Sequence, residues 1–347
     1  MKKTNKILSV FLALIMVISI IPMSSITASA ETYSGNCGSN LTWTYDSETY
    51  TLTISGTGAM YNYYNSNDIP WYMYSYNIKT IVINEGVTTI GAMAFCNCKY
   101  VTDIPIPDSV TSIGMGAFIG CTSLTNMTIP DSVTSIGSQA FIECTSLTSA
   151  TIPENVTTIG EGPFAGCTSL VEITVDNNNQ HYSNDEDGIL FNKDKTRLVQ
   201  YPAGNTRTRY AIPDGITTID AYAFSLCENI SVVAIPNSVK TIGLAAFQCP
   251  SLSAVYYSGT EKEWSEIDFT SYNEPLLLSS IHFNHTEHTD NDNDGSCDEC
   301  GKSINPKIAC DHNCHKGGIS GFFWKITNFF NKIFGLKKYC ECGVAHY

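Results

Sequence analysis

Residues 106–128 read IPDSVTSIGMGAFIGCTSLTNMT, and this pattern of apolar residues, glycine and proline returns every 23 residues. Complete copies begin at Ile83, Ile106, Ile129, Ile152 and Ile212, and a copy that is one residue shorter begins at Ile235. Self-similarity at a fixed period of this length is typical of repeat proteins, in which one short unit stacks on the next. The sequence therefore predicts a solenoid over the middle of the chain.

Four apolar columns run through the copies and predict the core of this solenoid. They are Val110, Val133 and Val156; Ile113, Ile136 and Ile159; Phe118, Phe141 and Phe164; and Leu124, Leu147 and Leu170. One unit cannot bury its own apolar face, so each unit must pack against its neighbours. The stretch L-T-x-x-x-I-P predicts a short strand that ends at proline, which has no N–H to donate. The I-G pair predicts a turn, where glycine tolerates a positive φ. Adjacent strands are expected to be parallel, about 4.8 Å apart.

The repeat motif I-P-x-x-V-x-x-I-G-x-x-A-F-x-x-C-x-x-L resembles that of the BspA-like leucine-rich repeat family of bacterial surface proteins. The resemblance covers Ile78 to Phe283. It implies a right-handed leucine-rich repeat solenoid, rich in β-structure, with a parallel sheet of short strands lining one side. It also implies adhesion, or binding of host and matrix proteins, although a fold alone does not establish a function.

The regions outside the repeats divide the chain further. Residues 1–30 have a basic start, an apolar run and a small-residue A-x-A site, which together predict a secretory signal peptide and an extracellular location. Residues 31–77 are expected to form an N-terminal cap, and 78–283 the repeats, with an insert at 175–211. Residues 284–316 form a Cys/His/Asp-rich linker, and 317–347 a Cys-rich end with an amphipathic helix.

The cap and the insert each allow two interpretations. Residues 41–60 alternate apolar and polar residues around a turn and predict a β-hairpin. The aromatic run from Tyr61 to Tyr76 either packs within the cap or contacts a ligand. The insert also predicts a hairpin, with apolar residues on both sides of Lys193–Lys195. It is either a larger coil that keeps the repeats in register or a loop that contacts a partner. Trp264 is expected to cover the last coil.

Composition excludes some classes of protein and leaves the cysteines to be explained. The net charge of -14, from 33 acidic and 19 basic residues, argues against nucleic-acid binding. The chain has 14 cysteines, and one repeat column consists of Cys98, Cys121, Cys144, Cys167, Cys227 and Cys249. Side chains in one column point the same way at the spacing of the coils, so buried thiols are expected there. Scattered disulfides are the alternative, because export permits oxidation.

The linker carries two overlapping metal-binding patterns. His285, His288, Cys297 and Cys300 could surround a tetrahedral Zn²⁺. Asp290, Asp292, Asp294 and Asp298 have the spacing of a calcium loop, but the twelfth position is glycine rather than the bidentate glutamate of an EF-hand. A solvated acidic linker without metal, or a C-x-x-C disulfide, would explain the same residues. The remaining tail cysteines allow a second zinc site or disulfides.

The final segment predicts a basic amphipathic helix. Its apolar and aromatic residues include Phe322, Phe323, Trp324, Ile326, Phe329, Phe330, Ile333 and Phe334, and lysines accompany them. The segment is short for a bilayer span, which needs about 20 apolar residues. It suits the membrane interface, with rings in the lipid and lysines near anionic headgroups. Docking onto the protein's own core or onto a partner is the alternative.

The expected function is non-catalytic binding of proteins or glycans on host or bacterial surfaces. The outward strand positions are expected to be mostly Thr, Ser and Asn, which suits hydrogen bonding with a ligand. No G-x-S-x-G, H-E-x-x-H or glycine-rich phosphate motif is present, and Asp185, Glu186 and Asp187 are expected to be solvated. A structural envelope component is the alternative, and an exported hydrolase a weaker one.

Overall fold

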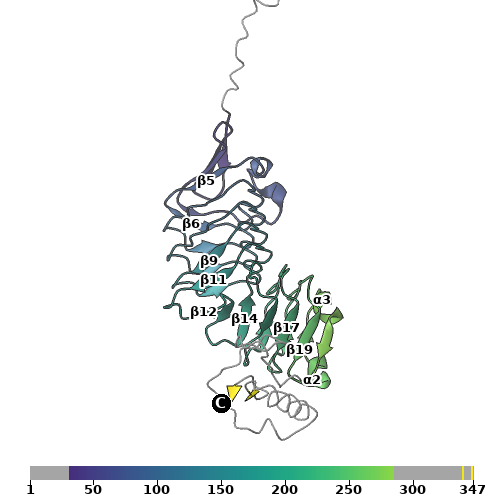
Figure 1. Ribbon diagram of the computed structural model, residues 1–347. Helices are drawn as coiled ribbons and strands as arrows, with labels where there is room; N and C mark the ends of the chain where they lie inside the picture. The colour runs from purple at the N-terminus through teal and green to yellow at the C-terminus, as the bar shows by residue number, and fades with distance from the viewer. Residues whose placement is uncertain (1–30, 285–337, 340–344, 347) are drawn as a thin grey trace, which may run out of the picture.

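The computed structural model describes residues 31–284, 338–339 and 345–346 of the chain. Residues 31–284 form a solenoid of about eight coils, each stacked on the one before it (Figure 1). Strands from successive coils lie along two sides of the stack, and apolar side chains fill the space between them. The predicted solenoid with parallel strands is confirmed.

One side of the stack carries the longer strands, here named the long ladder. It consists of β5 (Thr80–Ile83), β9 (Ser149–Ile152), β11 (Glu172–Val175), β15 (Arg209–Ala211), β17 (Val232–Ile235), β19 (Ala254–Tyr257) and β21 (Ser280–His282). β9 pairs with β11, and β15, β17, β19 and β21 pair in that order, all in parallel. Exposed and buried residues alternate in β9, which ends at Ile152, directly before Pro153. These are the strands that L-T-x-x-x-I-P predicts.

A second set of strands, the short ladder, was not predicted from the sequence and lies directly before the predicted turns. It consists of β4 (Gly58–Ala59), β6 (Val87–Ile90), β7 (Ser112–Ile113), β8 (Ser135–Ile136), β10 (Thr158–Ile159), β14 (Arg197–Gln200), β16 (Thr218–Ile219), β18 (Thr241–Ile242) and β20 (Asp268–Phe269). Its neighbours also pair in parallel, in two sheets that end at β10 and resume at β14. The predicted turn directly follows the I-G pair, at residues 115–120 of the coil that begins at Ile106, whereas the strand that contains the isoleucine was not predicted.

The glycine of the I-G pair lets the backbones of adjacent coils approach closely, and it does not adopt a positive φ. A Cβ on Gly137 would lie 2.4 Å from the backbone nitrogen of Met115 in the preceding coil, which is closer than atoms can approach. Positive φ occurs instead two residues later, at Gly116 (59°) and, one coil on, at Gln139 (56°). The turn prediction therefore gave the wrong reason for this glycine.

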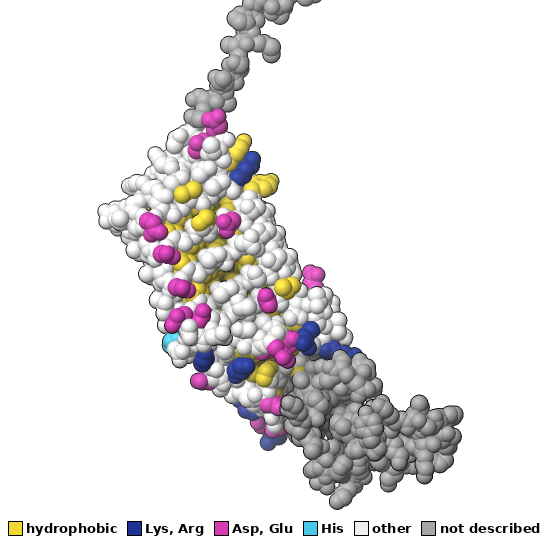
Figure 2. All heavy atoms as spheres, turned by 60° about the vertical axis from the view of Figure 1, so that its left-hand side comes forward, with side chains coloured by type: hydrophobic (Ala, Val, Ile, Leu, Met, Phe, Trp, Pro, Cys, Tyr) yellow, Lys and Arg dark blue, Asp and Glu magenta, His cyan; other side chains and the backbone are white. Residues whose placement is uncertain are grey.

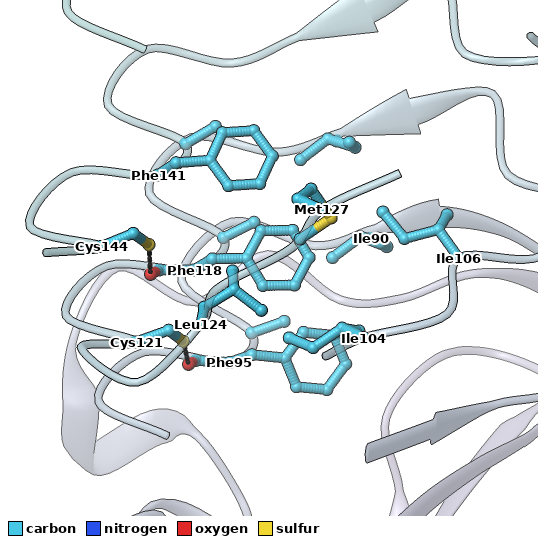
Figure 3. Close-up of a cluster of buried hydrophobic side chains, with 14 of the residues drawn as sticks. Ile90, Phe95, Ile104, Ile106, Phe118, Cys121, Leu124, Met127, Phe141 and Cys144 are labelled. Atoms are coloured by element: carbon cyan, nitrogen blue, oxygen red, sulfur yellow. Dashed lines mark hydrogen bonds between the residues drawn. The ribbon is translucent and has the colours of Figure 1, made fainter. Parts of the chain in front are cut away.

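The core is built on a stack of phenylalanine rings, one from each coil. Ring centroids of Phe95 and Phe118 lie 5.6 Å apart, those of Phe118 and Phe141 5.2 Å, and those of Phe141 and Phe164 5.3 Å. The four rings are buried and nearly parallel. Figure 3 shows those of Phe95, Phe118 and Phe141. The Val, Ile and Leu columns are buried beside them, so the predicted core columns are confirmed.

The repeat cysteines are buried free thiols, as predicted. Cys121 Sγ donates to the carbonyl of Phe95 at 3.2 Å, and Cys144 Sγ to that of Phe118 at 3.3 Å (Figure 3). Desolvation by burial is the largest cause that raises the pKa of Cys121 well above its ordinary value. Each thiol thus fills a small apolar space and links its coil to the preceding one.

The N-terminal cap combines an antiparallel sheet with an aromatic cluster. β1 (Thr32–Asn36), β2 (Leu41–Asp46) and β3 (Thr51–Gly56) are antiparallel, and β3 pairs in parallel with β5. The β2–β3 hairpin was predicted, whereas β1 was not. Two short 3₁₀ turns, η1 (Ser66–Asp68) and η2 (Tyr72–Tyr74), follow. Between them Trp71 stacks on Phe95 and donates its Nε1–H to the carbonyl of Ala94 at 2.8 Å.

The insert is a larger coil that restores both ladders. β12 (Tyr182–Asn184), β13 (Leu190–Asn192) and β14 are antiparallel, and β14 then pairs in parallel with β16. The ring stack resumes beyond it with Tyr201, Phe224 and Phe247. The stack bends where the insert lies (Figure 1). The structure therefore supports the larger-coil interpretation and contains the predicted hairpin.

Side chains replace the missing ladder hydrogen bonds at the junction. Tyr182 Oη accepts from the backbone N–H of Ile159 at 2.8 Å, at the end of the first short-ladder sheet. Buried Asn179 donates to the carbonyls of Pro153 (2.7 Å) and Val156 (3.1 Å). Asp220 occupies the position that is glycine in other repeats, and it pairs with Arg197 of the insert at 2.6 Å.

Two short helices close the other end of the stack. α2 (Glu261–Ser265) begins with a capping box between Thr260 and Glu263, and α3 (Glu274–Leu278) follows. Trp264 is buried, with its ring 5.1 Å from that of Tyr257, as the sequence predicts for the residue that covers the last coil. The last described strands, β22 (Lys338–Tyr339) and β23 (Ala345–His346), form a separate antiparallel pair.

Candidate interaction surface

The outer side of the long ladder is a surface where the repeats differ from one another. In the first half, two residues of each coil point outward next to the invariant inner ones. They are Thr80, Val82, Asp103, Pro105, Asn126, Thr128, Ser149, Thr151 and Glu172, and all are exposed. This side of the stack is thus polar, lightly charged and able to form hydrogen bonds.

Hydroxyl groups on this side are held in place by neighbouring coils. The Oγ1 atoms of Thr151 and Thr174 are 3.0 Å apart and hydrogen-bond to each other. Thr125 Oγ1 donates to the carbonyl of Thr102 at 3.2 Å. An ordered hydroxyl array loses less side-chain entropy when it binds a ligand than a mobile one does.

The second half of the long ladder has a different outer side. Ala211, Ala234, Tyr256 and His282 are in register across β15, β17, β19 and β21. The rings of Tyr256 and His282 stack at 4.6 Å, and Tyr256 also packs against Ala234. The expectation of mostly Thr, Ser and Asn is therefore wrong for these four strands, where small and aromatic residues replace them.

A row of carboxylates lies along the edge of the first half, directly after the long ladder. Glu85, Asp108, Asp131 and Glu154 follow one another at the repeat spacing, and each is exposed. Figure 2 shows Asp and Glu side chains along one flank of the stack. In residues 31–284 none of the four forms an ion pair. This row was not predicted, although the third position is acidic in five of the six repeats.

The acidic residues of the insert are more structural than the sequence suggests. Asp185 Oδ1 accepts from the backbone N–H groups of Ile189 (2.9 Å) and Asp187 (3.1 Å). Desolvation by burial is the largest cause that raises the pKa of Asp185. Asp187 pairs with Arg207 at 2.5 Å. The prediction that all three acids are solvated holds for Glu186 alone, which is exposed.

The aromatic run of the cap is packed within the cap in part and exposed in part. Tyr63 and Trp71 are buried and pack edge to face, which is cap packing. Tyr61, Tyr64 and Tyr76 are exposed, at 48%, 71% and 46%. These three rings are therefore accessible to a ligand.

The described residues contain no arrangement typical of catalysis or metal binding. Both described histidines with placed side chains, His181 and His282, are exposed, and no hydrogen bond joins either imidazole to a hydroxyl or thiol there. Within the same residues no three His, Cys, Asp or Glu side chains converge on a possible metal site. None of the helices described is long and apolar enough to cross a membrane.

The tail predictions lie outside the described residues and stay predictions. They comprise the zinc ligands His285, His288, Cys297 and Cys300, and the calcium ligands Asp290, Asp292, Asp294 and Asp298. They also comprise the membrane-contact residues Phe322, Phe323, Trp324, Ile326, Phe329, Phe330, Ile333 and Phe334.

Comparison with known proteins identifies the repeats. The family model described as "BspA type Leucine rich repeat region" matches six copies, over residues 68–185 and 204–294. A leucine-rich repeat protein from Eubacterium ventriosum is 29% identical with a TM-score of 0.53, over 65% of this chain and 72% of that one. A leucine-rich cell surface protein from Faecalibacterium prausnitzii is 20% identical, with a TM-score of 0.32, over 70% and 99% of the two chains.

The pneumococcal vaccine antigen PcpA is also similar, with 22% identity and a TM-score of 0.46, over 59% of this chain and 62% of that one. No curated protein matches the chain. The family model covers more than half of the sequence, and the solenoid has the stacked coils and buried columns that its motif implies. The chain belongs to the BspA-type leucine-rich repeat family.

Proposed function

We propose that the protein is a non-catalytic interaction scaffold that binds a protein or glycan ligand through the outer side of the first half of its long ladder. The observation that carries the proposal is the contrast between the two sides of each strand. Inward residues keep their type from coil to coil, whereas outward residues vary between Thr, Val, Asp, Pro, Asn, Ser and Glu. Variation confined to an exposed surface on a fixed core supports a binding role.

The charge of the first half of the solenoid indicates which partner surfaces it favours. The carboxylate row from Glu85 to Glu154 flanks this surface, and residues 31–192 contain 16 acidic residues but only two basic ones. Adjacent carboxylates at the coil spacing of about 4.8 Å attract cationic groups and repel anionic ones. A neutral or basic partner surface is therefore favoured at this side of the stack.

The expected setting is the cell surface or the medium outside the cell. The family and the fold support a surface interaction or adhesion role. The segment at residues 1–30 supports export, and export would bring the scaffold to host, matrix or neighbouring-cell ligands. A structural envelope role remains the alternative, with the repeats as a spacer.

A pull-down from host and bacterial surface extracts, followed by saturation binding of the recovered ligand, tests the proposal. The variant Thr128→Lys/Thr151→Lys changes two exposed residues of the long ladder. The matched control, Thr134→Lys/Thr157→Lys, changes two exposed residues that are also 23 positions apart but lie next to the short ladder. The first variant is expected to lose binding at least tenfold and the second to keep it. Equal binding by both variants would overturn the assignment of the surface.

The tail calls for separate experiments. We propose that it contacts the membrane through the aromatic residues named above and that its linker binds zinc or calcium. Deleting residues 317–338 should release the protein from the envelope fraction, and a truncated protein that stays bound argues against the anchor. Elemental analysis of reduced, purified protein should give one metal per chain. Absence of both metals would leave the linker as a polar connection or a disulfide.

A further inference from the structure

The first half of the solenoid has only two basic side chains, and both lie over tyrosine rings. Residues 31–192 contain no Lys or Arg other than Lys79 and Lys99. Lys79 Nζ is 4.3 Å from the ring centroid of Tyr50, and Lys99 Nζ is 5.2 Å from that of Tyr76. Both distances are within the range of cation–π attraction.

The stacking of the coils brings the two pairs onto one flank of the cap. The backbone N–H of Lys79 donates to the carbonyl of Tyr50 at 2.9 Å, so the first pair spans two adjacent coils. Tyr76 and Lys99 are 23 residues apart and occupy the same position of successive coils. Lys79 follows Tyr76 by three residues, at most about 10 Å along the chain. The short segment from Tyr76 to Lys79 therefore links the two pairs, which are here named the lysine–tyrosine cluster.

A third ring adds an apolar face to the cluster. Tyr100 directly follows Lys99 and is 60% exposed. Tyr76 is itself exposed and makes an edge-to-face contact with Tyr72 at 6.3 Å. Exposed tyrosine rings have an apolar body and a polar edge, and both can contact a ligand.

The two ammonium groups have no carboxylate of their own. Among the residues that the structure describes, neither Lys79 nor Lys99 forms an ion pair. Arg197 and Arg207 of the insert, in contrast, are paired with Asp220 and Asp187. Lys79 and Lys99 lie over rings instead, so their charge stays available to an anion from outside.

We propose that Tyr50, Tyr76, Lys79, Lys99 and Tyr100 bind an acidic carbohydrate, an oligosaccharide with carboxylate groups. The exposed ring of Tyr100 stacks on the apolar C–H face of a sugar ring, while the two lysines pair with carboxylates of neighbouring sugars. This site differs from the long-ladder surface of the proposed function and does not depend on it. An acidic peptide would meet the same charges but offers no flat C–H face to the rings.

Calorimetric titration of the full chain with short oligogalacturonates tests the proposal. Saturable binding is expected, which weakens as salt is added because exposed charges are screened. The neutral oligogalactose of equal length should bind at least tenfold more weakly. The double variant Lys79→Gln/Lys99→Gln and the single variant Tyr100→Ser should each lose at least tenfold in affinity.

The controls use a matched lysine and the other surface. Lys195 also lies over a ring, that of Phe191 at 5.7 Å, but it belongs to the insert. Lys195→Gln and Thr128→Lys/Thr151→Lys should bind the acidic sugar like the unmodified protein. Thermal unfolding of each variant checks that it is folded.

Three outcomes would overturn the proposal. These are absence of saturable binding to the acidic sugar, equal binding of the neutral sugar, and an equal loss in the Lys195 variant. Binding of poly-glutamate with the same affinity and the same lysine dependence, without dependence on Tyr100, would replace the carbohydrate by an acidic peptide. None of these results changes the outcome of the long-ladder experiment, so the two proposals fail independently.

Discussion

The coils before and after the insert have the same core but are held together differently. Before it, the coils from Ile83 to Val175 repeat without change in length, and glycine lets each backbone touch the last. After it, the first coil has Asp220 in place of that glycine, and an ion pair to Arg197 replaces the close approach. The difference teaches that a charged side chain fits at this position when the preceding coil supplies a partner for it.

The two regions also differ in the residues that they present outward. The first region has Thr, Ser, Asn and acidic residues on its long ladder, whereas the second has a row of alanines that leads to the stacked Tyr256 and His282. Inner columns are shared because they must stack. Outer positions are free of that requirement, so each region can present its own surface on one scaffold.

The largest expected effect comes from removing the close approach in the first region. Gly137→Asp would place a Cβ 2.4 Å from the nitrogen of Met115 and force two coils apart. We expect the free energy of unfolding to fall by about 5 kcal/mol or more, in the range of severe core disruption. Urea unfolding followed by circular dichroism measures this. Asp220→Gly, at the same position of the second region, should cost less, and an equal or larger cost would contradict the comparison.

The ring stack should give the next largest effect. Phe141 lies between two rings, at 5.2 and 5.3 Å, whereas Phe247, in the described part of the chain, stacks on one ring, that of Phe224 at 4.7 Å. Phe141→Ala is expected to cost about 4 kcal/mol because it leaves a cavity. Phe247→Ala should cost about 1 kcal/mol less, since it loses one ring pair fewer. The free energies of unfolding of the two variants, measured under the same conditions, show whether ring stacking stabilises the fold beyond the burial of each ring. Equal losses in the two variants would contradict the prediction.

A smaller effect is expected at the junction itself. Asn179 is fully buried, donates to Pro153 and Val156, and accepts from the backbone N–H groups of His181 and Tyr182. Asn179→Ala should cost about 2 kcal/mol, because buried backbone groups lose their partners. Hydrogen exchange should become faster at the amides of His181 and Tyr182.

The neighbouring residue provides the control for this prediction. Asn178 is exposed, and Asn178→Ala should stay within about 0.5 kcal/mol of the unmodified protein. Uniformly faster exchange along the whole solenoid, rather than at the junction, would show that Asn179 is not a local connector.

The smallest effect is a dependence on pH. The folded pKa of Asp185 is raised, mainly by desolvation, so folding favours its protonated form. Its contribution to stability is therefore full below the unfolded pKa of about 3.9 and is lost as pH rises through the folded value. Asp185→Asn removes this dependence.

Thermal unfolding of both proteins across the acid range measures the effect. Tm of the unmodified protein minus Tm of Asp185→Asn should fall as pH rises. Asp194→Asn, at an exposed position of the hairpin turn, is the control and should show no such trend. A Tm difference that is constant with pH, or that grows as pH rises, would contradict the raised pKa of Asp185.

Much of the fold could be predicted because six copies of the repeat carry the same pattern of apolar residues. The buried Val, Ile, Phe and Leu columns follow from their period, and the free thiols follow from sharing one column. The short ladder was missed because its strands are only two residues long in most coils, too short for an alternating pattern. The role of Gly137 was misjudged because a sequence does not distinguish a glycine that allows contact from one that allows a turn.

The candidate surface could be predicted only in part. The polar outer residues of the first region follow from the strand pattern, but those of the second region do not, because the insert separates β15 from the repeats that define the motif. The Lys79–Tyr50 pair joins residues of the cap and the first coil, which share no repeat. Contacts of this kind depend on how a cap meets the array, and no period in the sequence encodes them.

The identical packing of successive coils has a consequence for how the molecule can change over generations. Duplication or loss of one 23-residue unit would leave every remaining contact intact, because each coil touches only its neighbours. The reach of the molecule would change in steps of about 4.8 Å, one coil at a time. Gain or loss of whole repeats in the gene can therefore change the distance between the two ends of the protein in fixed steps. The surfaces at either end would stay unaltered.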